Sequence, residues 1–198
     1  LDVDSIIDEA EQLEGIIDSL AEAFASAQVV VNAAGLAAPN MQDLPPLMGA
    51  NALLPAVIAI AAQRTGVRRV IHLSSAAVQG PRPVLDASEE TAPFSAYSFS
   101  KTLGEEALLD LQDYFLEEHP ESAPELCILR ATSVQGRGRR TTELFAKMAS
   151  SPFASVAGAG QGKSPVSSVY ALSEFVVMLG TFPGELPTIV LQPWEGAT

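Results

Sequence analysis

Short apolar runs that end in small or polar residues constrain the fold of this chain more than any other feature. Four such runs read as strands: "QVVVNAAG" from Gln28, "VRRVIHLSS" from Val67, "LCILRATSV" from Leu126 and "PTIVL" from Pro187. Segments with helical periodicity separate them, at 5–27, 48–65, 96–119 and 169–179. Strands that alternate with helices predict βαβ units, and hence a parallel sheet covered on both faces. Ligands of such sheets bind at the carboxyl ends of the strands, where we therefore expect the functional residues.

The apolar segment 48–65 is predicted to be a largely buried helix. Gly66 ends it, and Pro55 within it should kink or restart the helix because proline has no N–H to donate. Polar residues and Pro55 interrupt this and every other apolar stretch, so we predict no transmembrane helix.

The composition and charge of the chain argue against several classes of function. The chain has 198 residues, 47% of them hydrophobic, which fits a single domain with a sizeable core. Its net charge of −13 argues against binding to nucleic acid or to anionic membranes. Cys127 is the only cysteine, which excludes an intramolecular disulfide and favours a reducing compartment, so we expect a cytoplasmic protein. The start of the chain does not resemble a secretory signal, and we expect no metal site because no His/Cys/Asp cluster has ligand spacing.

The most informative short motif is "SAYSFSK", which carries Tyr97 and Lys101 at the start of the helix predicted from about Ala96 to His119. Positions i and i+4 share one helix face, so both side chains can address one point. An ammonium near a phenol should lower its pKa, and such a tyrosine can exchange a proton with an alcohol or a carbonyl. Ser74 and Ser75, at the end of the second strand, can each supply a hydroxyl that holds the substrate oxygen.

The order of these motifs resembles the extended short-chain dehydrogenase/reductase family, the NAD(P)-dependent sugar-nucleotide epimerases and dehydratases. "VVVNAAG" is similar to the family's cofactor-bordering strand, "HLSSAAVQG" to its "SS-x-x-V-Y-G", and "YSFSK" to its Tyr-x-x-x-Lys. "LRATSVQGRG" resembles "LR-P-x-N-V-Y-G-P-G". The resemblance implies an α/β, Rossmann-type doubly wound sheet over 1–135, with substrate-lobe segments and a returning strand over 136–198. It also implies an NAD or NADP cofactor, a nucleotide-sugar substrate and pairing as a homodimer through the helices 48–65 and 96–119.

The resemblance also assigns site residues. Ser75, Tyr97 and Lys101 would be catalytic, with Tyr97 as the acid/base and Lys101 as the ligand of the cofactor ribose. The predicted cofactor-binding residues are these two together with Asp2, Asn32, Ala33, Ala34, Gly35 and Asn51. The predicted substrate-binding residues are Ser133, Arg137, Arg139 and Arg140. The three arginines fit equally a clamp for a diphosphate and a solvated basic loop.

Several positions depart from the family pattern. Ala76 and Ala77 stand where the dehydratases have Asp and Glu, which argues against a 4,6-dehydratase. Gln79 and Gln135 replace motif tyrosines, and Ser133 replaces the substrate asparagine. No Gly-x-x-Gly-x-x-Gly motif occurs in the chain, so we expect about sixty residues with the opening strands of the family to be missing.

These departures keep two alternatives open: a reductase of a non-sugar carbonyl, and a non-catalytic nucleotide-binding or scaffold protein. "AGAGQGKS" at 157–164 ends like a P-loop, but its first glycine is replaced by Ala157 and Pro165 follows, so we expect a loop of the substrate lobe. Glu105 and Glu106 are predicted to lie on a solvated helix face.

Overall fold

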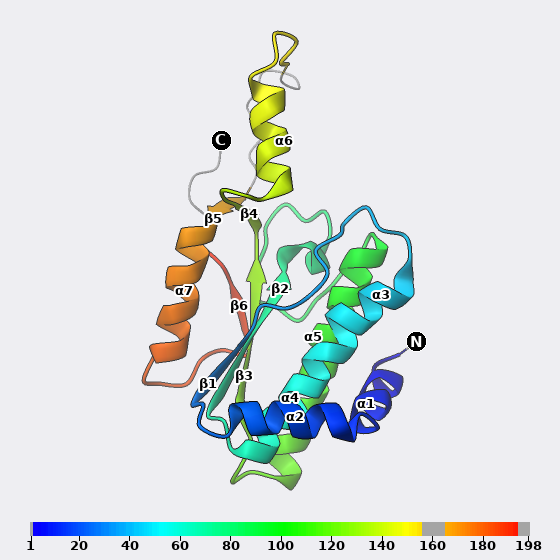
Figure 1. Ribbon diagram of the computed structural model, residues 1–198, viewed down its shortest axis with the longest axis vertical. Coiled ribbons are helices and arrows are strands. Elements are labelled where there is room, and N and C mark those ends of the chain that lie inside the picture. The colour runs from blue at the N-terminus through cyan, green and yellow to red at the C-terminus, as the bar shows by residue number, and fades with distance from the viewer. Residues whose placement is uncertain (1, 156–164, 194–198) are drawn as a thin grey trace.

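A four-stranded parallel sheet forms the centre of the molecule, as the alternation of strands and helices predicts. The computed structural model describes residues 2–155 and 165–193 (Figure 1). The strands lie in the order β1 (Val29–Asn32), β2 (Arg69–Ser75), β3 (Glu125–Ala131) and β6 (Ile189–Leu191). Their register aligns Val31 with Ile71, and Ile71 with Cys127, so the carboxyl ends of β1, β2 and β3 lie at one edge.

Helices cover both faces of this sheet, which confirms the predicted Rossmann-type α/β fold (Figure 1). One face carries α1 (Val3–Glu11), α2 (Glu14–Phe24), α4 (Leu54–Thr65) and α5 (Ala96–Glu118). The other face carries α7 (Val169–Thr181), whose Leu172 and Leu179 pack against Ile71 and Leu129. Burial of each such side chain stabilises the fold by about 1.5–3 kcal/mol. Because α7 lies opposite α4 and α5, the connection from β3 to β6 has the opposite hand to the two before it.

The segment predicted as one helix over 5–27 is two helices. The chain turns at Gln12–Leu13, where the Leu13 N–H bonds to the Ala10 carbonyl. This turn lets α2 pack along α4 through Ile17, while α1 extends to α5 through Ile6 and Ala10. Helical periodicity alone does not reveal the turn, because it continues across both helices.

The apolar helix predicted over 48–65 begins earlier and changes its winding. It consists of α3 (Leu44–Met48), the π-helical segment η1 (Gly49–Leu53) and α4. The Leu54 N–H donates to the Gly49 carbonyl five residues back, and Pro55 follows as the second residue of α4. The backbone stays right-handed helical through Leu53 and Leu54, so the helix changes its winding before Pro55 but does not restart there. By length and composition, Leu44–Thr65 could cross a membrane, but here it is a core helix whose residues 55–62 are all buried.

A small second sheet lies beyond the carboxyl edge of the main one. The strand predicted over 126–134 breaks after Ala131, and β4 (Ser133–Gln135) pairs in parallel with β5 (Val166–Ser168). The helix α6 (Arg140–Ala149), for which we made no prediction, projects from this end without a buried residue (Figure 1). The P-loop-like segment 157–164 lies outside the described residues.

Candidate active site

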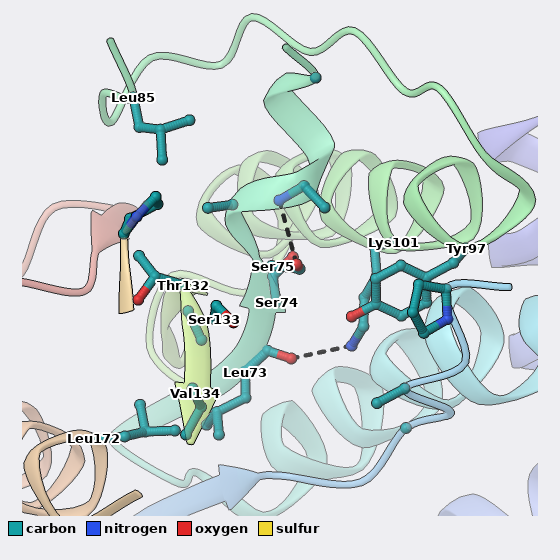
Figure 2. A pocket seen from close by; sticks show the side chains of 18 of the residues that line it. Leu73, Ser74, Ser75, Leu85, Tyr97, Lys101, Thr132, Ser133, Val134 and Leu172 are labelled. Atoms are coloured by element: carbon teal, nitrogen blue, oxygen red, sulfur yellow. Dashed lines mark hydrogen bonds between the residues drawn. The ribbon is translucent and has the colours of Figure 1, made fainter. Parts of the chain in front are cut away.

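A cavity of about 940 Å³ opens at the carboxyl ends of β1, β2 and β3, where the topology predicted the functional residues. The loops that follow these strands line it, together with the first turns of α5 (Figure 2). Of the predicted site residues, the structure brings eight to this cavity: Ala33, Ala34, Gly35, Ser75, Tyr97, Lys101, Ser133 and Arg139.

Tyr97 and Lys101 reach the cavity from successive turns of α5. Ser95 caps this helix, accepting a hydrogen bond from the Ser98 N–H at 3.1 Å, and so fixes where the first turn begins. The Lys101 side chain is 5% exposed, and its Nζ donates to the Leu73 carbonyl of β2 at 3.0 Å (Figure 2). Burial lowers the pKa of Lys101 to about 8, although the Glu105 carboxylate acts in the opposite direction.

The pKa of Tyr97 is raised in this structure, whereas the sequence predicted that Lys101 would lower it. Burial of the phenol is the largest cause, and the Ser75 side chain and the positive charge of Arg139 offset it in part. The phenol is therefore neutral at pH 7 and can donate its proton.

The structure distinguishes the two candidate serines. Ser74 is buried, and its hydroxyl donates to Glu105 Oε1 at 2.5 Å. Ser75 Oγ accepts a hydrogen bond from the Ala77 N–H at 3.2 Å (Figure 2), and its hydroxyl lines the cavity. Ser75 is thus the serine placed to act beside Tyr97.

Glu105 does not lie on a solvated face, so that prediction was wrong. It is 1% exposed and forms an ion pair with Arg130 of β3, with Arg130 Nη2 2.7 Å from Glu105 Oε2. The sequence signal was Arg130 itself, because a cation at the end of the apolar run "LCIL" needs a buried anion.

Asn32 and Asn51 are buried and do not line the cavity. Asn32 Nδ2 donates to His72 Nδ1 at 3.0 Å, so the proton of the neutral imidazole is on Nε2. Asn51 Nδ2 bonds to Ser100 Oγ at 3.0 Å, and its Oδ1 accepts from the Leu36 N–H at 2.9 Å. Asn32 Oδ1 accepts from the Ala34 N–H at 3.1 Å, so both predicted cofactor ligands support the loop that carries Ala33–Gly35.

The structure leaves no room for a side chain at Gly35. Its φ is +154°, and a β-carbon there would lie 2.9 Å from Asn51 Oδ1 and 3.3 Å from Lys101 Nζ. The backbone of this loop can therefore approach the Lys101 ammonium closely.

The remaining predicted ligands lie elsewhere. Asp2 caps α1, accepting from the Ser5 N–H at 3.0 Å, and does not line the cavity. All three arginines are exposed, and of them only Arg139 lines the cavity.

Comparison with known proteins decides the family. The model of the NAD dependent epimerase/dehydratase family matches residues 15–174. The chain belongs to this family. No curated protein sequence matches the chain significantly.

Several solved structures share the fold of this chain at low sequence identity. TunA, an NAD-dependent NDP-hexosamine 5,6-dehydratase involved in tunicamycin biosynthesis, is 21% identical with a TM-score of 0.73, over 92% of this chain and 60% of its own. UDP-glucuronic acid 4-epimerase from Bacillus cereus is 16% identical with a TM-score of 0.73, over 90% and 58%. MoeE5, solved with UDP-glucuronic acid and NAD, is 18% identical with a TM-score of 0.72, over 90% and 60%. The chain thus spans about 60% of the length of these proteins.

The sequence alone did not identify part of the cavity wall. Residues 82–85, between η2 (Ala76–Gln79) and α5, line the cavity, and so do Thr132 and Leu172. Pro83, Val84, Leu85 and Leu172 have apolar side chains without a chemical signature, so only the fold identifies them.

Proposed function

We propose that the protein transfers hydride between an NAD-type cofactor and a carbinol or carbonyl carbon of a nucleotide-linked sugar, as an oxidoreductase or epimerase. Membership of the NAD-dependent epimerase/dehydratase family supports this, as does the likeness to proteins solved with NAD and UDP-glucuronic acid. The observation that carries the proposal is the convergence of Ser75, Tyr97 and Lys101 on one cavity beside the Ala33–Gly35 loop.

The residues present fit the nicotinamide end of such a cofactor. Lys101 Nζ has three donors, of which one is used by the Leu73 carbonyl, so the others can bind ribose hydroxyls. The space that a β-carbon would fill at Gly35 lies beside this ammonium. When bound, the cofactor supplies or accepts the hydride; Lys101 and the 33–35 loop would hold it.

The chain's own residues handle the proton. In the reducing direction, neutral Tyr97 donates its hydroxyl proton to the substrate oxygen, while the Ser75 hydroxyl hydrogen-bonds the same oxygen. The positive charge of Arg139 and the Ser75 hydroxyl stabilise the phenolate that forms. In the oxidising direction the phenolate takes the proton back from the alcohol.

Replacement of the hydroxyl tests this proposal. In the full-length protein, Tyr97→Phe should lower turnover of a nucleotide sugar by about 10²–10⁴-fold, measured by NADH absorbance or product analysis. Tyr114→Phe, on the exposed side of α5, is the matched control and should leave turnover unchanged. Full turnover by Tyr97→Phe would show that the assigned acid/base is wrong.

A second candidate is reduction of a non-sugar carbonyl. One observation favours it: among the described residues that line the cavity, none is Asp, Glu, Asn, Gln or His, the side chains that best hydrogen-bond sugar hydroxyls. Assay of UDP-sugars against hydrophobic ketones separates the two candidates. Calorimetry with NAD and with NADP tests both candidate functions. If the protein bound neither cofactor, any redox function would be contradicted.

The lack of a carboxylate among the described residues that line the cavity also supports the expectation that the protein is not a 4,6-dehydratase. Ala76 and Ala77 line the cavity directly after Ser75, where an acid–base pair would be needed to eliminate water. We therefore propose epimerisation or oxidoreduction as the reaction type.

A further inference from the structure

The segment 81–94, which we call the strap, forms one wall of the cavity opposite the sheet. It connects η2 to α5, and Arg82, Pro83, Val84, Leu85 and Phe94 line the cavity from it. Leu85 extends from the strap toward the cavity (Figure 2). Apart from Arg82, which pairs with Glu90, this wall is apolar.

Two hydrogen bonds join the strap to Gln79 at its base. Gln79 Nε2 donates to Asp86 Oδ1 at 2.8 Å, and the Asp86 N–H donates to Gln79 Oε1 at 3.1 Å. Gln79 is fully buried, so both bonds are shielded from water at one end. Asp86 directly follows Leu85, and this pair therefore sets the position of the wall.

Asp86 also organises the strap beyond itself. Its Oδ1 accepts from the Ser88 N–H at 3.0 Å and from Ser88 Oγ at 2.6 Å. The bonds from Ser88 and from Gln79 lower the pKa of Asp86 to about 2, so it remains charged at physiological pH. The Ser88 carbonyl in turn accepts from Nη1 of the buried Arg130 at 2.5 Å.

We propose that Gln79 and Asp86 form a clamp that fixes the strap as an apolar wall of the substrate cavity, where the apolar part of the substrate binds. Gln79 is then a positioning residue, at a position where the family pattern has tyrosine. The inference rests on the proposed function in one respect, because that function assigns the cavity to the substrate.

A reciprocal exchange tests the clamp. Gln79→Glu removes the donor and places two carboxylates together, whereas Gln79→Glu combined with Asp86→Asn restores one donor and one acceptor across the pair. Amide hydrogen exchange at Asp86 and Ser88 should be at least ~10-fold faster in Gln79→Glu and return toward the wild-type rate in the double variant. Gln112→Glu is the control, because Gln112 makes two similar bonds far from the strap, to Pro124 and Leu126.

Binding of 8-anilinonaphthalene-1-sulfonate, an apolar aromatic anion, gives a second readout by fluorescence titration. Its affinity should fall several-fold in Gln79→Glu and recover in the double variant. If the buried charge prevents folding, Asp86→Ala removes the exposed partner and should accelerate strap exchange with the fold retained. Strap exchange that is unchanged in folded Gln79→Glu or Asp86→Ala, or that is not restored in the double variant, would overturn the clamp.

These measurements are independent of catalysis. Exchange and dye binding need neither cofactor nor turnover, so a clamp that behaves as proposed stands even if Tyr97→Phe disproves the reaction. Conversely, Tyr97→Phe could lose turnover while mutation of Gln79 leaves amide exchange in the strap unchanged. That pair of results would reject the clamp but not the proposed reaction.

Discussion

Gly104 of α5 lies directly against the main-chain carbonyl of Asn51 in η1: a β-carbon on Gly104 would be 2.1 Å from that oxygen. Pro55, four residues after Asn51, has no N–H to donate to this carbonyl. The contact brings α5 close to η1, and Asn51 Nδ2 then reaches Ser100 one turn earlier on α5. The position of Lys101 therefore depends on a glycine one turn away.

Gly104→Ala should destabilise the protein by about 1–3 kcal/mol, because backbone must move to admit the methyl group. Urea unfolding measures the change. Gly15→Ala is the matched control in α2, since nothing lies within 4 Å of its β-carbon position and alanine favours helix. Equal stabilities for the two variants would contradict the close contact.

The stability contribution of Lys101 should depend on pH in a defined window. Its pKa is about 8 in the folded protein against 10.5 as the ordinary value, so the folded state loses the proton first. Between pH 8 and 10.5 the unfolded state binds more protons, and stability therefore rises with pH. The unfolding free energy of the wild type, relative to that of Lys101→Met, should therefore increase from pH 7 to 10. If the difference between the two proteins stayed constant over this range, the lowered pKa of Lys101 would be contradicted. Lys147→Met, on exposed α6, is the control.

Glu105→Ala should be strongly destabilising, by roughly 3–5 kcal/mol, because it leaves Arg130 charged and buried. Arg130 is 0% exposed and Ser74 would lose its acceptor as well. Denaturant unfolding measures the loss. Glu14→Ala, which breaks the exposed pair with Arg64, should change stability little, and a comparable loss there would refute the role of burial.

Asp110→Asn should raise the melting temperature at pH 7. The pKa of Asp110 is raised by partial burial and by the negative charges of Asp4 and Asp113, so its ionised form is unfavourable in the folded state. A raised carboxyl pKa destabilises above that pKa, and the penalty disappears as the pH falls and the group is protonated. The advantage of the variant should therefore vanish in acid; an advantage that persists there would contradict the electrostatic cause.

Much of the fold could be predicted because the two central strands, β2 and β3, are buried along most of their length. Short apolar runs mark β1, β2 and β3, and the ends of these runs identify the edge where Ser75, Tyr97 and Lys101 meet. The turn between α1 and α2 could not be predicted, since the apolar period continues through it. Nor could β5, whose residues Val166–Ser168 carry no strand signature without their partner β4.

The candidate site could be predicted in its catalytic residues but not in its electrostatics. The i, i+4 spacing located Tyr97 and Lys101 on one face, yet the sign of the Tyr97 pKa shift depends on burial, which local sequence does not report. Asn51 shows the same limit. Its family position implied contact with the cofactor, whereas the three-dimensional structure places its amide between Leu36 and Ser100.

The π-helical segment Gly49–Leu53 has a consequence for how this sequence can vary. A π turn holds one more residue than an α turn over the same rise, so deletion of a single residue there would restore regular α-helix without shortening the rod appreciably. The helix before the segment would keep nearly the same rotation relative to α4, because the π turn already absorbs the extra residue. The backbone of the segment itself would change, and Asn51 lies in it with its bonds to Leu36 and Ser100. A deletion at this point should therefore spare the length and direction of the helix and act on the anchor of the loop beside Lys101.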